Sequence, residues 1–163
     1  MGIRKGYKLF RLKDGRLYPL YILYNKSILL GQWLDAEVGP LASDGVHVKG
    51  KMTLAMRPGW HIAGSRPEAP QITIKDNLVW AEVEYHDDVD YDTEAKANGY
   101  KNGHWAAVRA YIKHIPKNGF YMYKTSWKQT EPWVIAGEMR VVRVLSDEEV
   151  ERLNSHYLHR KEL

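Results

Sequence analysis

The chain has 163 residues, a formal net charge of +4 and 44% apolar residues, which suits one folded domain over residues 1–163 and excludes a disordered chain. It contains no cysteine, so disulfides, cysteine-ligated zinc and thiol nucleophiles are excluded. No apolar run is long enough to span a bilayer and the first residues lack the apolar stretch of a signal peptide, so a cytoplasmic protein without a membrane partner is expected.

Alternating apolar and polar residues predict a series of short strands. They fall at 7–12, 16–23, 27–33, 46–56, 79–85, 120–125, 133–136 and 139–145. Asp14-Gly15 predicts a hairpin turn between the first two strands, and Pro19 predicts that the second is an edge strand or contains a bulge. Residues 35–45, 57–70 and 87–103 are predicted loops, and 105–115 is ambiguous between helix and strand.

The last element has the clearest signature, that of a helix beginning after Ser146. Ser146 and Glu149 have the spacing of a capping box. Val150, Leu153, Tyr157 and Leu158 then form one apolar face. Together these elements predict an α+β fold, with a curved, mostly antiparallel β-sheet and a C-terminal helix in a single domain.

The aromatic residues are unusual in kind, with 11 Tyr and 6 Trp but 2 Phe. One interpretation is a β-rich domain, because strands favour Tyr and Trp. The other is a surface on which a ligand or nucleic-acid bases stack. The isoelectric point of about 9.1 permits a phosphate-rich partner without requiring one.

The standard catalytic and phosphate-binding motifs are absent. The sequence has no Walker A motif, no G-x-G-x-x-G, no H-E-x-x-H and no G-x-S-x-G. Asp88, Asp90 and Asp92 imitate the start of an EF-hand loop, but Thr93 stands where that loop needs glycine. A solvated loop is therefore expected there, and a looser cation site with His86 stays open as the alternative.

Arg57-Pro58-Gly59-Trp60-His61 is the most distinctive run. Pro58 and Gly59 predict a sharp bend that presents Trp60 and His61. An imidazole beside an indole suits a planar ligand or general acid–base chemistry, whereas the structural alternative is a corner with Trp60 in the core.

A second group of candidates lies in the C-terminal third. Glu138 interrupts two apolar runs, so it is either a buried carboxyl with a raised pKa or an exposed edge residue. Lys124, Trp127, Lys128 and Trp133 mix cations with aromatic rings, as single-stranded nucleic-acid sites and ordinary amphipathic surfaces both do.

Four runs occur in an order that suggests a known domain. They are RPGWH at 57–61, VWAEVEY at 79–85, NGFYMYKT at 118–125 and WVIAGEMRVVRVLSDEEV at 133–150. In these runs the chain resembles an uncharacterised domain of phage and mobile-element proteins of gut bacteria, which also occurs inside large polyvalent proteins. The resemblance implies a genomic setting and no particular activity.

Phe10-Arg11, Gly59-Trp60-His61 and Glu138 resemble a second family, that of the ADP-ribosyltransferase-like fold. The resemblance implies that Arg11 or His61 holds the phosphates or ribose of NAD. It also implies that Glu138 stabilises the ribosyl cation. The chain departs from that family because it has no Ser-Thr-Ser motif.

The sequence therefore supports several hypotheses. The first is a phage or mobile-element accessory protein that binds a phosphate-containing ligand, which is a nucleic acid or a nucleotide, or else a host protein. The alternatives are an NAD-dependent ADP-ribosyltransferase-like enzyme and a structural component of a phage particle. The candidate catalytic residues are Arg11, His61 and Glu138. The candidate ligand-binding residues are Arg57, Trp60, Lys124, Trp127 and Trp133. Convergence of the three catalytic candidates in one cleft would favour the enzyme, whereas a basic aromatic face would favour the binding module.

Overall fold

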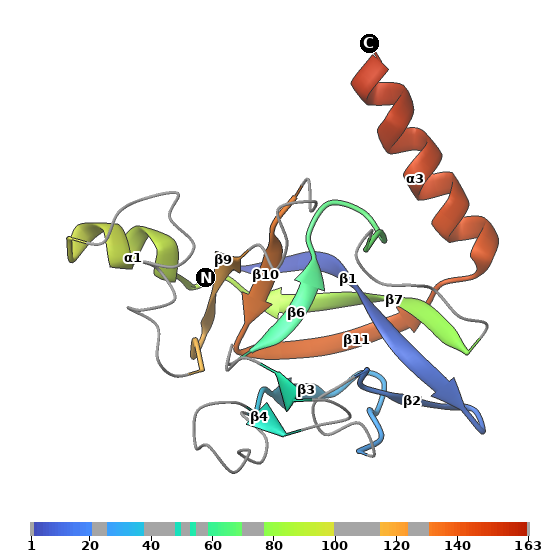
Figure 1. Ribbon diagram of the computed structural model, residues 1–163, viewed down its shortest axis with the longest axis horizontal. Helices are drawn as coiled ribbons and strands as arrows, with labels where there is room; N and C mark the ends of the chain where they lie inside the picture. Colours follow the sequence, from blue (N-terminus) through green and yellow to red (C-terminus); the bar gives the residue numbers. More distant parts are fainter. Residues whose placement is uncertain are drawn as a thin grey trace.

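A strongly curved, mostly antiparallel sheet forms the body of the protein, and a long C-terminal helix extends away from it (Figure 1). The computed structural model describes residues 2–20, 26–37, 48–49, 53–54, 59–69, 77–99, 115–123 and 131–162. At 48–49, 53–54 and 156–162 it describes the backbone alone. The predicted α+β class, with a mostly antiparallel sheet and a C-terminal helix, is confirmed, and the sheet is open.

Within the described residues, nine strands form the main sheet in the order β3-β11-β7-β1-β6-β10-β9-β8, with β2 paired to β1 off this path. The strands are β1 (Ile3–Lys13), β2 (Arg16–Tyr18), β3 (Trp33–Asp35), β6 (Trp60–Ala63), β7 (Leu78–His86), β8 (Val89–Asp90), β9 (Gly119–Tyr123), β10 (Trp133–Ala136) and β11 (Glu138–Val144). Every pair is antiparallel except β8 with β9. A separate two-stranded ribbon joins β4 (Val48–Lys49) to β5 (Thr53–Leu54).

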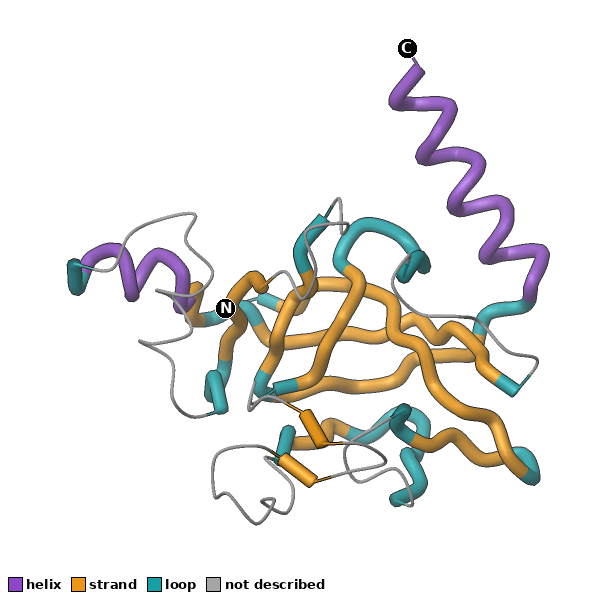
Figure 2. Tube along the Cα trace, in the orientation of Figure 1, coloured by secondary structure: helices purple, strands orange, loops and turns teal. Residues whose placement is uncertain are grey.

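Gly137 explains why the sheet bends so strongly. It alone separates β10 from β11 in the chain, although β6, β1 and β7 lie between those strands in the sheet. In a flat sheet, strands four steps apart would be about 19 Å apart, so the sheet curves until these ends meet (Figure 2). A Cβ atom at Gly137 would lie 2.3 Å from the carbonyl oxygen of Pro116, so this corner requires glycine.

The curvature gives the sheet an inner and an outer face, each with its own apolar cluster. The inner face carries Phe10, Ile62, Val83 and Met139 among its buried residues. Side chains of the alternate positions form the cluster on the outer face, which includes Leu9, Trp80, Tyr121, Trp133 and Ile135. This follows from the period of two along a strand, which sends successive side chains to opposite faces.

Helix α3 (Asp147–Glu162) packs its first turns on the outer face, where Val150 and Leu153 contact the outer cluster. The predicted capping box is confirmed. The backbone N–H of Glu149 donates to Ser146 Oγ at 3.2 Å, and the Glu149 carboxylate accepts from the N–H of Ser146 at 3.3 Å. This element therefore starts where its sequence predicts.

Two predicted loops contain regular structure. Residues 57–70 include β6, so Trp60 and His61 lie in a central strand and not at a bend. Gly59 adopts φ 138°, and a Cβ there would lie 2.4 Å from Ile135. The chain thus turns at Gly59 and enters the sheet beside β10. The prediction failed because Pro and Gly dominate the local pattern while the strand is stabilised by pairing on both sides.

Residues 87–103 also include two elements, β8 and helix α1 (Tyr91–Ala97). The acidic run supplies the N-cap of this helix, since Asp90 accepts from the backbone N–H groups of Asp92 and Thr93. The prediction of a loop was wrong because polar capping residues resemble loop residues in sequence.

The remaining predictions differ in their outcome. The strands near 7–12, 79–85, 120–125, 133–136 and 139–145 and the Asp14-Gly15 turn are present. The second strand ends at Tyr18, and the third lies later, at Trp33–Asp35. Most of 105–115 lies outside the described residues. In the part of the chain that the structure describes, no helix has the length and apolar composition needed to cross a bilayer.

Candidate functional site

Trp60 and His61 point to opposite faces of β6. The indole Nε1 of Trp60 donates to the carbonyl oxygen of Leu34 at 3.0 Å, and its ring packs against the inner cluster. His61 pairs with Ile135 in β10, and its ring meets that of Trp133 edge-on with centroids 6.2 Å apart. Trp60 is thus partly buried within a strand, and its polar edge links β6 to β3.

The contacts described for the three catalytic candidates lie at three different places. Arg11 Nε donates to the carbonyl oxygen of Pro19 at 3.0 Å, at the base of the β1–β2 hairpin. Glu138 accepts the backbone N–H of Asn118 on both carboxylate oxygens, at 3.0 and 3.1 Å. His61 contacts Trp133. Glu138 thereby holds the loop before β9, which is a structural task that its position at the start of β11 allows.

The ligand-binding candidates are also separated. Trp133 is buried in the outer cluster, with 7% of its surface exposed, so its ring offers no face for stacking. Trp60 is engaged as described above. Arg57, Lys124 and Trp127 lie outside the described residues.

The acidic run has structural partners. Asp88 accepts the backbone N–H of Gly2 at 3.1 Å, and Asp92 accepts that of Met122 at 2.9 Å. Burial raises the pKa of Asp92 to about 6, the hydrogen bond from Met122 opposes this, and the charge of Asp90 adds to it. Among the described residues, no group of three metal-ligating side chains gathers that would hold an ion.

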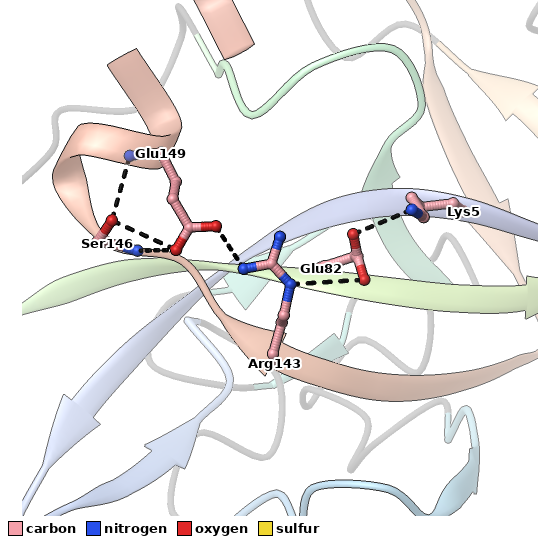
Figure 3. A network of polar contacts seen from close by, with 5 residues as sticks. All are labelled: Lys5, Glu82, Arg143, Ser146 and Glu149. Atoms are coloured by element: carbon pink, nitrogen blue, oxygen red, sulfur yellow. Dashed lines mark hydrogen bonds and ion pairs between the residues drawn. The ribbon is translucent and has the colours of Figure 1, made fainter. Parts of the chain in front are cut away.

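Several cations on the outer face are neutralised by carboxylates. Lys5 lies 3.2 Å from Glu82, which also pairs with Arg143, and Arg143 in turn binds Glu149 at the start of α3 (Figure 3). The hydrogen bond to Glu149 raises the pKa of Arg143 further. This face is therefore close to charge balance.

A second ion pair lies on the same face. Arg140 binds Glu84 at 2.6 Å, and its guanidinium lies 4.8 Å from the centre of the Trp33 ring. Trp33 also stacks against His86, with ring centroids 4.0 Å apart. These side chains are engaged with one another, which leaves little unpaired positive charge over β7 and β11.

Unlike the cations over β7 and β11, those of the β1–β2 hairpin lie next to other cations. Arg11 pairs with Tyr18 and Lys13 pairs with Arg16 across its two strands. Directly opposite residues share a face, so three cations and one tyrosine lie together on one side of the hairpin. Lys13 and Arg16 are exposed, and neither has an ion-pair partner among the described residues. We call Arg11, Lys13, Arg16 and Tyr18 the basic hairpin face.

The β1–β2 hairpin projects from the sheet, but its turn and its buried side both have defined contacts. Asp14 and Gly15 form the turn with φ 52° and 74°, the left-handed backbone that a tight hairpin needs. On the opposite side of the hairpin, Leu17 is buried, and an isolated antiparallel β-bridge pairs it with Ile28. The hairpin extends beyond the rest of the sheet (Figure 1), so its basic face is presented on a fixed support.

Sequence reasoning found the turn and Arg11 but not this face. The signal was present in the run Arg11-Leu12-Lys13-Asp14-Gly15-Arg16-Leu17-Tyr18. A two-residue turn fixes the register, and the register places every second side chain on one side. The pattern of cations could then have been assigned to one face.

Lys8 is a further group that sequence reasoning missed. It lies on the inner face, where its Nζ donates to the carbonyl oxygen of His61 at 2.8 Å and lies 5.9 Å from the centre of the Trp60 ring. Burial lowers the pKa of Lys8 to about 8. The alternating pattern of this strand does not predict a lysine on the apolar face, because the residues on either side of Lys8 on that face, Gly6 and Phe10, are compatible with both faces.

No protein-family model, no curated protein and no solved structure matches this chain. The two resemblances given by the sequence motifs therefore stay predictions.

Proposed function

We propose that the protein is a binding module for a phosphate-bearing ligand, a single strand of nucleic acid, and that the basic hairpin face makes the phosphate contacts. The observation that carries the proposal is the pairing of Lys13 directly opposite Arg16. Like charges at directly opposite positions destabilise a sheet, by roughly 0.2–1 kcal/mol. An anionic ligand removes that cost by lying across both side chains.

The other members of the face add to this interaction. Arg11 stacks on the ring of Tyr18, with its guanidinium 5.5 Å from the ring centre. A guanidinium held in this way is oriented before the ligand arrives, and arginine is well suited to phosphate. Tyr18 also gives a base a ring edge or face to pack against.

The charge balance elsewhere supports the choice of this face. Lys5, Arg140 and Arg143 already bind carboxylates, and a phosphate would have to displace those partners. Lys13 and Arg16 have no such competitor among the described residues. The resemblance to phage and mobile-element domains is compatible with a nucleic-acid ligand, but the proposal does not depend on it.

The experiment is fluorescence anisotropy with a labelled single-stranded DNA over a salt series. The test variant is the double substitution Lys13→Ser and Arg16→Ser. The matched control is Lys96→Ser and Lys117→Ser, which removes the same charge from exposed positions elsewhere. We expect the test variant to reduce the slope of log K against log salt by about 1.4, which corresponds to two phosphate contacts on a single strand. The control should keep the wild-type slope.

Two results would overturn the proposal. One is the absence of binding by the wild-type protein at low salt. The other is an equal loss of affinity in the test and control variants, which would show that only net charge matters. Competition by unlabelled RNA and by a mononucleotide then separates a strand from a single nucleotide as the ligand.

A further inference from the structure

The large apolar side chains that remain exposed gather in one part of the fold. Among the described residues six such side chains are exposed, and five of them have between 38% and 57% of their surface accessible along a single path. We call these five the apolar rim: Leu12, Leu29, Leu30, Val142 and Val144. The sixth, Ile3, lies apart from them near the start of β1.

Backbone contacts join the members of the apolar rim. Leu12 pairs with Leu17 across the β1–β2 hairpin. The segment 28–31, which contains the two exposed leucines, begins with an N–H that donates to the carbonyl oxygen of Leu17. It ends with an N–H that donates to the carbonyl oxygen of Val141, and both hydrogen bonds are 2.8 Å long. The segment therefore crosses from β2 to β11, and β11 continues from there through the two exposed valines.

A connected set of exposed apolar side chains has a different meaning from a single one. Isolated surface leucines are normal in soluble proteins, whereas an exposed apolar patch marks a surface that another molecule covers. Ile3 is an isolated case, and the apolar rim is a patch. The rim is therefore a candidate contact surface, and the charges around it indicate which molecule fits.

The two ends of the apolar rim carry opposite charge. Lys13 and Arg16 adjoin Leu12 at the hairpin end, while Asp147 and Glu148 follow shortly after Val144 at the other end. These four charged side chains are exposed, and none has an ion-pair partner among the described residues. The hairpin turn and the start of α3 both lie at the right of Figure 1.

This arrangement of charge is complementary to itself. In a two-fold contact, a residue at one end of a surface meets a residue at the other end of the same surface on the second copy. Two apolar rims in contact about a two-fold axis would place Lys13 and Arg16 of each copy beside the two carboxylates of the other. Arg143, between the exposed valines, is already bound by Glu149, so it adds no unpaired like charge at the centre.

We propose that the apolar rim is the contact surface between two copies of this chain in a two-fold dimer. The exposed leucines and valines of the two copies pack on one another, and the basic end of each rim pairs with the acidic start of α3 in the other copy. Because the patch is small, the dimer is a weak and reversible one.

The dimer goes beyond the proposed binding of nucleic acid, although Lys13 and Arg16 belong to both surfaces. Phosphates and the carboxylates of a second copy would compete for these two cations. The dimer is therefore tested without nucleic acid, so that its failure leaves the nucleic-acid proposal standing, and the salt series with single-stranded DNA tests that proposal by itself.

The first test is sedimentation equilibrium of the full chain over a wide range of protein concentration. We expect a reversible monomer–dimer equilibrium for the wild-type protein. Leu30→Ser should raise the dimer Kd at least about ten-fold, because the apolar contact is lost twice in a two-fold dimer. Ile3→Ser is the matched control, since the two side chains are 52% and 56% exposed, and it should keep the wild-type Kd.

Two results of this test would overturn the proposal. A wild-type protein that stays monomeric at every concentration would leave the apolar rim to a different protein. Equal effects of Leu30→Ser and Ile3→Ser would show that the rim is not the contact surface.

The second test exchanges the charges at the two ends of the rim. Arg16→Glu and Glu148→Lys should each weaken the dimer when the variant is alone, because each places like charges together. In a mixture of the two variants, both end contacts are again between opposite charges, so the mixed dimer should regain an affinity within about three-fold of the wild-type value. Glu94→Lys is the control partner for Arg16→Glu, because Glu94 is exposed on α1, at the left of Figure 1.

The mixture with Glu94→Lys should stay as weak as Arg16→Glu alone. Equal recovery in both mixtures, or recovery in neither, would contradict the two-fold arrangement. The exchanged residues are exposed, so we expect these variants to unfold as cooperatively as the wild-type protein. If Leu30→Ser does not fold, the comparison of the two mixtures decides.

Discussion

At the residue scale, Lys8 is a side chain whose burial destabilises the folded protein. Its ammonium group is a cation on the inner, apolar face, next to the Phe10 and Trp60 rings. Burial lowers its pKa from 10.5 to about 8. The charged form is therefore less favourable in the folded state than in the unfolded chain, and at neutral pH this difference lowers the free energy of unfolding.

We predict that Lys8→Met raises the free energy of unfolding at pH 7 by roughly 1–3 kcal/mol, because it removes this buried charge. The sign follows from the lowered pKa. In the wild-type protein, stability from this group increases as the pH rises from about 8 to 10.5, and the variant should lack that increase. Urea unfolding at pH 7 and pH 9.5 measures both effects. Lys5→Met, on the exposed outer side, should change stability by less than about 1 kcal/mol. A less stable Lys8→Met protein would contradict the prediction.

Asp92 is an acid whose pKa is raised, whereas Lys8 is a base whose pKa is lowered, and it gives a second pH-dependent prediction. Its pKa is raised to about 6, chiefly by burial. A raised carboxyl pKa means that the folded state holds its proton more tightly than the unfolded chain. The stabilising contribution is therefore complete below pH 3.8 and is lost as the pH rises through about 6.

We expect Asp92→Asn to remove this loss, because asparagine keeps an oxygen that accepts from Met122 and cannot ionise. The stability of the variant relative to the wild-type protein should increase by about 1–2 kcal/mol between pH 4 and pH 7. Chemical unfolding at a series of pH values provides the measurement. A pH-independent difference between the two proteins would show that Asp92 is not responsible.

The candidate residues illustrate what sequence alone determines at this scale. The motifs drew attention to Trp60 and Glu138, and in the structure each makes a specific polar contact. The partners, however, are backbone groups of Leu34 and Asn118, which lie 26 and 20 residues away. Such partners depend on which strands become neighbours, and nothing in the local sequence specifies that.

At the scale of elements, those with a strong local signal were predicted and those stabilised by neighbours were not. The alternating β7 segment and the capping box of α3 needed no tertiary information. In contrast, β6 has only four residues and follows a run of Pro and Gly. It is a strand because β1 and β10 flank it, so its formation depends on pairing between distant parts of the chain.

The cap of α3 yields a prediction for a whole element. Ser146→Ala removes the hydroxyl that accepts from the N–H of Glu149 and donates to its carboxylate. We expect a loss of about 1 kcal/mol of stability, together with faster amide hydrogen exchange in the first turn of α3. Ser155→Ala, a substitution of an exposed serine within the same helix, is the control and should be neutral or slightly stabilising. Equal effects of the two substitutions would show that the cap does not matter.

For the whole molecule, the decisive feature is that the sheet doubles back on itself. The sequence predicted a curved antiparallel sheet, but it did not predict that β10 and β11 lie on either side of three intervening strands. Strand order is a non-local property, and short alternating segments carry little information about it. In this arrangement Arg11, His61 and Glu138 lie in different surroundings, and the β1–β2 hairpin projects from the body.

Gly137 is the residue on which this architecture depends most directly. A Cβ at this position would lie 2.3 Å from the carbonyl oxygen and 2.8 Å from the carbonyl carbon of Pro116. Both are backbone atoms of the segment before β9, in which the N–H of Asn118 donates to the Glu138 carboxylate. The carbonyl oxygen of Gly119, the first residue of β9, accepts from the N–H of Gly137. The corner therefore has little freedom to make room for a methyl group.

We predict that Gly137→Ala costs at least about 2 kcal/mol of stability, because it forces apart the β10–β11 corner and the β9 segment. Gly64→Ala is the matched control. Its Cβ would meet only a side-chain methyl group of Val134, at 3.2 Å, and Gly64 is exposed. The control should therefore change stability by less than about 1 kcal/mol. Thermal unfolding of both variants is the measurement. If Gly137→Ala proves as mild as Gly64→Ala, the tight corner is not what holds the two flanks of the sheet together, and the pairing of β6 with β10 must do so instead.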